Sequence, residues 1–186
     1  MRLIKLISIA TACLLIFGCT KNTPLVTEEH VDPDEFVGEW YVISNIPYFA
    51  ERNKVGSKTT YLKTGANNYQ DIFESRNGSF NNKIDKLVGA AKSLNEHNTQ
   101  WQSIFYWVMR FKFEVLDVDD DYQIALLGHQ SRKYGWVMAR TKSISTQSYA
   151  QAMLVFNENG YDTTLFSKVP QYSTDIGKEG YQVVSN

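Results

Sequence analysis

Residues 111–115 read Phe111-Lys112-Phe113-Glu114-Val115, a strict alternation of apolar and charged side chains. Successive residues of a β-strand point to opposite faces, so the two phenylalanines and the valine share one face while the charges share the other. A strand with one apolar and one wet face is typical of an antiparallel sheet that closes into a barrel in water. This stretch therefore predicts an all-β fold.

Short apolar and aromatic segments recur from Trp40 onward, and turn-forming residues separate them. The turn signals stand at 64–65, 77–78, 81–82, 95–98, 119–121 and 128–132. Short strands between regularly spaced turns indicate an antiparallel meander. The chain of 186 residues also holds 4 Trp, 11 Tyr and 10 Phe, which suit strands around a large apolar interior better than a helical bundle.

The segment 146–157 follows a helical period instead. Ser145 can cap its start, and Gly160 can follow its end. Its apolar side chains fall on one stripe, made of Tyr149, Ala152, Met153 and Phe156. We expect one helix here, packed on the outside of the barrel.

The N-terminal residues 1–18 predict a secretory signal, with Arg2 and Lys5 before an apolar run over 6–17. That run is too short to cross a bilayer as a helix, which takes about 20 residues. Gly18-Cys19 resembles the bacterial lipoprotein box, which implies that Cys19 is acylated; the alternative is an ordinary cleavage site. Because Thr20 and not Asp follows, the resemblance implies lipid anchoring at the periplasmic face of a Gram-negative outer membrane.

We therefore expect three parts: the signal peptide 1–18, a lipidated N-terminus and tether over 19–33, and one barrel domain over 34–186. The tether is expected because residues 20–33 are polar and contain Pro24 and Pro33.

Three motifs occur in order along the domain: Gly38-Glu39-Trp40-Tyr41, then Asp121-Tyr122, then a segment from Tyr134 to Arg140. Together they resemble the signature regions of the lipocalins, and the lipoprotein signal makes the resemblance closest to the bacterial lipocalins. The resemblance implies an eight-stranded antiparallel up-and-down barrel with one C-terminal flanking helix. It also implies that Gly38, Trp40 and Arg140 close one end, with the guanidinium across the indole in a cation–π contact.

The other end of such a barrel leaves room for one small ligand. Counting strand faces by twos gives the expected wall of the cavity. The candidates are Val42, Ser44, Tyr61, Phe111, Phe113, Val115, Ile124, Leu126, Tyr134, Trp136 and Met138. The run 104–109, Ile-Phe-Tyr-Trp-Val-Met, is either core or an exposed patch for membrane or partner contact.

The resemblance implies a carrier of a small lipophilic molecule, a fatty acid or (lyso)phospholipid, that serves cell-envelope maintenance. The alternatives are a lipocalin-fold enzyme and a structural envelope lipoprotein whose barrel is plugged. We expect no metal site, because His30, His97 and His129 stand far apart without a cysteine partner. We also expect no cofactor, no catalytic residues and, at a net charge of -1, no nucleic-acid partner.

Overall fold

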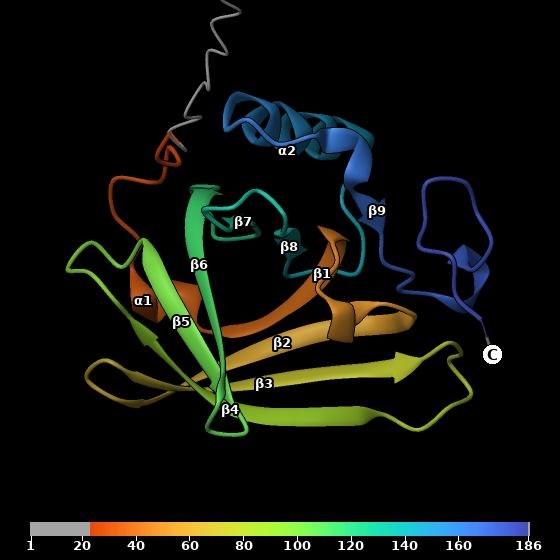
Figure 1. Ribbon diagram of the computed structural model, residues 1–186, viewed down its shortest axis with the longest axis horizontal. Coiled ribbons are helices and arrows are strands. Elements are labelled where there is room, and N and C mark those ends of the chain that lie inside the picture. The colour runs from red at the N-terminus through yellow and green to blue at the C-terminus, as the bar shows by residue number, and fades with distance from the viewer. Residues whose placement is uncertain (1–22, 186) are drawn as a thin grey trace, which may run out of the picture.

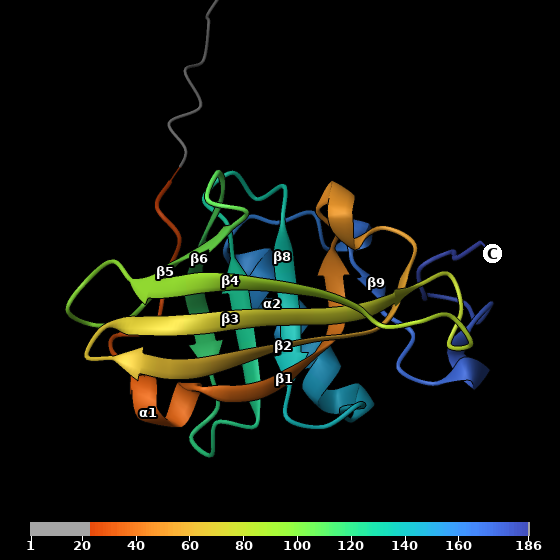
Figure 2. The same ribbon diagram turned by 90° about the horizontal axis from the view of Figure 1, so that it is seen from below.

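The computed structural model describes residues 23–185, so the predicted signal peptide and Cys19 lie outside the described residues. Each strand pairs antiparallel with the next one along the chain, and β1 pairs with both β2 and β8. This confirms the predicted eight-stranded up-and-down barrel (Figures 1 and 2). The strands are β1 Gly38–Ile46, β2 Lys54–Gly65, β3 Asn68–Asn77, β4 Asp85–Ser93, β5 Gln100–Phe105, β6 Met109–Val118, β7 Ile124–Gly128 and β8 Gly135–Ala139.

The helix α2, Thr146–Glu158, confirms the single late helix expected from the sequence. At its start the Ser145 side chain accepts a hydrogen bond from the Ser148 N–H, and after its end Gly160 takes a φ of 78° that favours glycine. The helix lies outside the barrel, across the side formed by β7 and β8 (Figure 1).

Five shorter elements complete the chain: α1 Pro33–Phe36, η1 Phe49–Glu51, η2 Thr163–Leu165, β9 Ser167–Lys168 and η3 Ser173–Asp175. The strand β9 pairs with β1 and brings the C-terminal segment onto the barrel. There Gln171 donates two hydrogen bonds from its amide, to the carbonyl oxygens of Val42 and Ser57. No helix within residues 23–185 is long and apolar enough to cross a membrane.

Residues 23–33 pack against the domain, whereas their polar composition predicts a tether up to residue 33. Leu25 and Val31 are buried, and Val31 donates its N–H to the carbonyl oxygen of His97 at 2.9 Å. Glu28 likewise donates its N–H to Val115 at 3.1 Å. Two apolar side chains and a few backbone hydrogen bonds suffice to hold the segment, and average composition does not reveal them.

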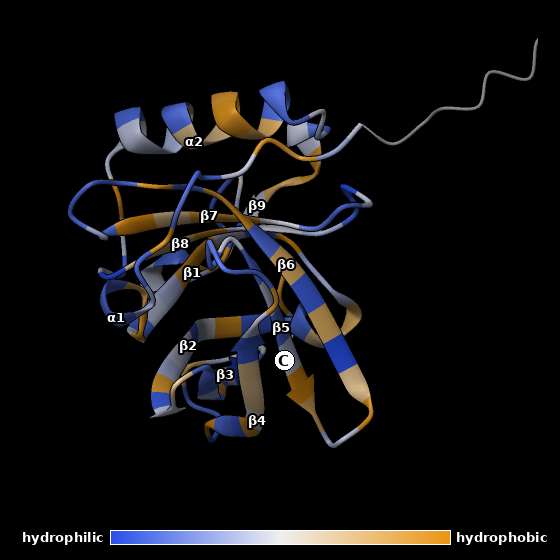
Figure 3. Ribbon diagram, turned by 90° about the vertical axis from the view of Figure 1, so that its left-hand side faces the viewer, coloured by the Kyte–Doolittle hydropathy of each residue, from blue (hydrophilic) through white to orange (hydrophobic). Residues whose placement is uncertain are grey.

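Apolar side chains form two separate layers. One fills the barrel interior, and the other lies between the helix α2 and the outer faces of β1 and β6 to β8. Figure 3 shows β6 alternating between hydrophobic and hydrophilic residues along its length, as the sequence predicted. In contrast, β7 and β8 are apolar on both faces, because one face meets the interior and the other meets α2.

Candidate functional site

One end of the barrel is closed by Trp40 and Arg140. The indole is completely buried, and its Nε1–H donates to the carbonyl oxygen of Phe36 at 2.8 Å. The guanidinium carbon of Arg140 lies 3.7 Å from the centre of the indole ring, which is a cation–π contact. Gly38 has a φ of 103°, and a Cβ at this position would lie 3.1 Å from the Arg140 guanidinium. The structure thus brings together the three residues expected to close the barrel.

The guanidinium of Arg140 also holds the chain that enters the barrel. Its N–H groups donate to five backbone carbonyl oxygens, those of Glu35 at 2.6 Å, Phe36 at 3.4 Å, Val37 at 2.9 Å, Glu39 at 2.9 Å and Tyr122 at 3.1 Å. A planar fork of donors can satisfy this many acceptors at once, whereas an ammonium group cannot. Arg140 therefore joins α1, β1 and the turn before β7.

Aromatic rings form a floor just inside this closed end. Phe36 lies 5.4 Å from Trp101 and 5.8 Å from Tyr61, and Tyr69 lies 4.9 Å from Trp101, measured between ring centres. All four side chains are buried in the interior core. This layer excludes water from the closed end of the barrel.

Above the floor lies a partly open cavity of about 120 Å³. On the same scale one water molecule takes roughly 10–15 Å³, so the space suits a small ligand or a hydrocarbon chain. The wall is mainly apolar and aromatic, with Val42, Tyr48, Ala50, Tyr61, Phe73, Leu87, Phe105, Met109, Phe111, Phe113, Leu127, Trp136 and Met138. Four polar residues complete it: Glu51, Thr59, Asp71 and Ser103.

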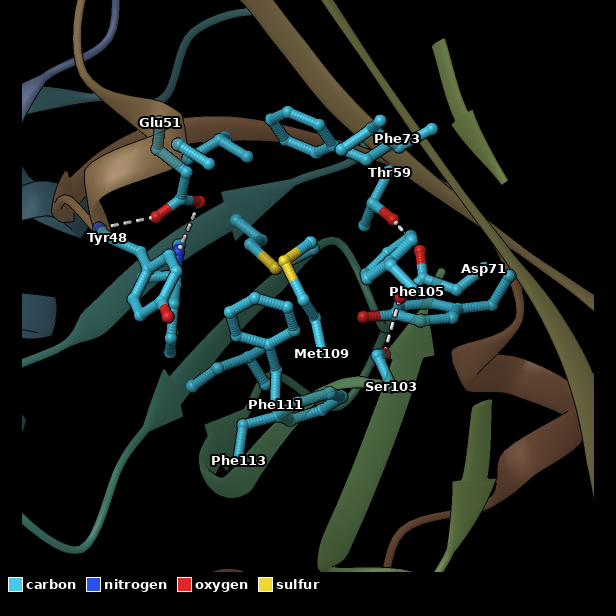
Figure 4. Close-up of a pocket in the computed structure, with 17 residues that line it drawn as sticks. Tyr48, Glu51, Thr59, Asp71, Phe73, Ser103, Phe105, Met109, Phe111 and Phe113 are labelled. Atoms are coloured by element: carbon cyan, nitrogen blue, oxygen red, sulfur yellow. Dashed lines mark hydrogen bonds between the residues drawn. The ribbon is translucent and has the colours of Figure 1, made fainter. Parts of the chain in front are cut away.

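Asp71 projects from β3 into the cavity near the floor (Figure 4). Its side chain is buried, with 3% of the residue exposed. One carboxylate oxygen accepts a hydrogen bond from the Thr59 hydroxyl, and the other accepts from the Ser103 hydroxyl, each at 2.5 Å. Burial raises the pKa of Asp71 to about 6, and the two hydroxyl groups oppose that rise.

Glu51 lies on η1, in the connection between β1 and β2 at the open end. One of its oxygens accepts from the Trp136 indole N–H and the other from the Tyr48 backbone N–H, both at 2.8 Å. Burial raises the pKa of Glu51 to about 7, and the hydrogen bonds from Trp136 and Tyr48 oppose that rise. Figure 4 shows Glu51 and Asp71 on opposite sides of the cavity, with aromatic side chains and Met109 between them.

The two carboxylates are the only carboxylic acids among the residues that line the cavity in the described chain, and this lining contains no Lys, Arg or His. The electrostatic character of the pocket is therefore negative or neutral, depending on protonation. Among residues 23–185, no three His, Cys, Asp or Glu residues form a group that could hold a metal ion.

Most of the predicted wall residues line the cavity: Val42, Tyr61, Phe111, Phe113, Trp136 and Met138. Val115 is buried in the interior core and does not line the open space. Tyr134 lies beside the open end, where its ring packs at 5.1 Å against Tyr48.

Ser44, Ile124 and Leu126 require correction, because they lie on the outer face of the barrel. A β-bulge between Val42 and Ser44 reverses the alternation in β1, and the Ser44 hydroxyl hydrogen-bonds to Tyr149 of α2 at 3.0 Å. In β7 the register fixes the faces, since Leu127 pairs with the inward-facing Val115 and Trp136. Ile124 and Leu126 therefore point outward and pack in the layer beneath α2.

The polar residues of the cavity were not predicted from the sequence. Asp71 could have been found, because Tyr69, Asp71 and Phe73 alternate with Gln70 and Ile72 and so place an acid on an aromatic face. Glu51 gave no such signal, since it lies outside the strands and reaches the cavity only through the fold.

The aromatic run 104–109, left open between core and exposed patch, is divided between the two. Phe105 and Met109 line the cavity. Between them, Tyr106, Trp107 and Val108 are exposed, Trp107 by 93%. Tyr106 and Trp107 both have positive φ, 49° and 65°, so a tight turn directs this apolar tip into solvent.

A family profile described as a lipocalin-like domain matches residues 31–171. The chain is 26% identical over 165 residues to temperature-induced lipocalin-1 of Arabidopsis thaliana, covering 83% of this chain and 87% of that protein. It is 25% identical over 177 residues to the outer membrane lipoprotein Blc of Escherichia coli, covering 92% and 98% respectively. Among solved structures, insecticyanin of the tobacco hornworm Manduca sexta superposes with a TM-score of 0.64 at 14% identity, covering 88% of this chain and 89% of that one.

Proposed function

The chain belongs to the lipocalin-like family, and from this premise we propose that it binds and carries a small lipophilic molecule inside the barrel. The observation that carries the proposal is the apolar cavity above a floor sealed by aromatic rings. Transfer of hydrocarbon from water into such a cavity is favourable by about 25 cal/mol per Å² of apolar surface removed from water. A ligand can thus be held without covalent chemistry.

We propose further that the ligand is an amphiphile of the fatty acid or (lyso)phospholipid class and that the protein serves the cell envelope as a carrier and not as an enzyme. The cavity supports the hydrocarbon part, because its wall is lined by rings, Leu87 and Met109. The envelope role is supported by the predicted acylation site at Cys19 and by the likeness to a protein named as an outer membrane lipoprotein.

Two adjacent residues of β4 provide the test. Leu87 lines the cavity, whereas Val88 is 52% exposed on the outer face. We expect Leu87→Trp to fill the cavity and weaken binding of N-phenyl-1-naphthylamine, a neutral fluorescent probe, by about tenfold or more, while Val88→Trp leaves affinity within about twofold of wild type. Circular dichroism checks that both variants fold.

Equal affinity in the two variants would place the ligand outside the barrel and contradict the proposal. Native mass spectrometry of the purified wild-type protein separates carriage from a plugged barrel, because a carrier retains co-purified lipid. Turnover of a bound lipid into a new product would instead favour an enzyme.

A further inference from the structure

We propose that the cavity prefers amphiphiles whose polar group is an amine and that Asp71 receives the ammonium. This inference rests on the proposed function, since it assumes that the cavity holds an amphiphile. It goes further by stating the chemistry of the ligand's polar end, and it narrows the proposed ligand class, because it ranks a free fatty acid below an amphiphile that carries an amine.

The buried carboxylate of Asp71 is hydrogen-bonded by neutral groups alone. It accepts from two neutral hydroxyl groups, those of Thr59 and Ser103, and forms no ion pair with any described residue. A carboxylate offers about four acceptor positions, so roughly half of them remain for a ligand. A buried carboxylate without a cation is costly, and a ligand that supplies the cation removes that cost.

The side chains that line the cavity carry no positive charge. Its lining contains Asp71 and Glu51 but no cationic side chain. The carboxylate of a fatty acid would meet two acids and no positive partner, which is unfavourable in surroundings of low dielectric. An ammonium group carries the complementary charge and offers three hydrogen-bond donors.

Asp71 lies deep in the cavity, far from its open end. Asp71 pairs across the sheet with Tyr61, whose ring belongs to the aromatic floor, so the carboxylate lies at the inner end of the cavity. The rings of Phe73, Phe105 and Phe111 line the space beyond it. We therefore infer that the amine enters first and that the hydrocarbon chain extends toward Glu51 and the open end. The other ionisable groups that line the cavity are Tyr61 on β2, Tyr48 just before η1, and Glu51 on η1.

The alternative is that the Thr59–Asp71–Ser103 cluster only holds strands β2, β3 and β5 together. A matched ligand series separates the two roles. Dodecylamine, dodecanol and dodecanoic acid share one chain and differ in the polar group, and each is titrated at pH 7 as a competitor of N-phenyl-1-naphthylamine. For the wild-type protein we expect the amine to bind best and the acid worst, with the amine preferred over the alcohol by about tenfold.

Asp71→Asn keeps the size of the side chain and removes the charge. We expect it to reduce the preference for the amine over the alcohol to within about twofold while the alcohol still binds. Glu74→Gln on the same strand is the matched control, because Glu74 pairs with Lys58 and does not line the cavity, and it should keep the amine preference. Glu51→Gln tests the other carboxylate of the cavity. Asp71→Ser, which also removes the carboxylate, should reduce the preference in the same way and provides a second variant if Asp71→Asn does not fold.

The outcomes are distinct. Equal binding of the three ligands to wild type, or an unchanged amine preference in Asp71→Asn, would overturn the inference and leave the proposed function standing. Loss of the preference in Glu51→Gln alone would overturn the assignment to Asp71. If none of the ligands nor the probe binds the wild-type protein, the proposed function itself fails.

Discussion

Arg140 and Trp40 at the closed end each contact several segments of the chain. The Arg140 guanidinium covers the Trp40 indole and donates to carbonyl oxygens of three different segments. The indole in turn donates to Phe36 at the end of α1. Loss of either side chain should therefore loosen the entry of the chain into the barrel as well as the floor of the cavity.

We predict that Trp40→Ala lowers the free energy of unfolding by about 3–5 kcal/mol, because it deletes a large buried ring. Arg140→Ala should cost less, and a double-mutant cycle should show a coupling of roughly 0.5–2 kcal/mol between the two. Denaturant unfolding measures all four proteins. Arg140→Lys is the control, and it should also destabilise, since an ammonium keeps the charge but not the fork of donors. Additive effects of the two alanine variants would mean that the contact contributes no energy.

Asp71 predicts a pH dependence of stability in the ligand-free protein. Burial raises its pKa in the folded state to about 6, whereas an unfolded aspartate titrates near 3.9. Between these pH values Asp71 binds more protons in the folded state than in the unfolded state. Its contribution to the free energy of unfolding is therefore greatest below about pH 4 and is lost as the pH rises through 6. The decline attributable to Asp71 is on the order of 3 kcal/mol.

The measurement compares unfolding free energies of wild type and Asp71→Asn from pH 4 to pH 8. Asparagine does not ionise, so the difference between the two proteins should change across this range. Parallel curves would show that the pKa of Asp71 is the same in the folded and unfolded states. They would contradict the burial of an Asp71 carboxylate that has no cationic partner.

At the scale of elements, the sequence predicts which face of a strand points into the barrel only where the other face is exposed to solvent. The alternation in Phe111-Lys112-Phe113 fixes which side of β6 is internal. The segment 124–127 shows no such contrast, because α2 covers the outer face of β7. The sequence therefore predicts Ile124 and Leu126 on the inner face, whereas they lie on the outer face. The bulge after Val42 likewise has no local signal, since it is set by pairing with β8.

The helix α2 was predictable because its period and its Ser145 cap are local properties. Its position on the outside of the barrel was also predictable from its apolar stripe, but its individual contacts were not, since they depend on residues far apart in the chain. Phe156 is completely buried and packs 4.4 Å from Phe166 and 5.0 Å from Tyr161, between ring centres. Gly135 of β8 permits this approach, because a Cβ there would lie 2.9 Å from the Phe166 ring.

We predict that Phe156→Ala lowers the free energy of unfolding by about 3–5 kcal/mol through loss of this packing. Leu154→Ala on the same helix is the control, because Leu154 is 53% exposed, and it should change stability by less than about 0.5 kcal/mol. Probe affinity should be unchanged in the folded fraction of both variants, since α2 lies outside the barrel. A loss of affinity in folded Phe156→Ala would mean that the outer layer shapes the cavity.

At the scale of the whole molecule, the segment that follows the predicted acylation site packs against the domain, apart from the open end of the cavity. Leu25 packs in the outer layer beneath α2, and Val31 joins the interior core just before α1 at the closed end. The cavity lies inside, and its polar groups come from β2, β3, β5 and the connection η1. Membrane attachment and ligand binding should therefore be separable by mutation.

We predict that Cys19→Ser leaves the barrel folded and able to bind the probe but releases the protein from membranes. Multiple acyl chains at about 0.8 kcal/mol per buried methylene make attachment effectively permanent, and their loss removes it. Fractionation of cells that produce each variant measures the effect. Thr20→Asp is the matched control, because the resemblance to lipoprotein sorting signals implies that it keeps the protein lipidated and moves it to the inner membrane. A Cys19→Ser protein that stays in the outer membrane with full probe affinity would show that the folded domain itself contacts the bilayer, and the exposed tip at Tyr106, Trp107 and Val108 would be the first surface to mutate.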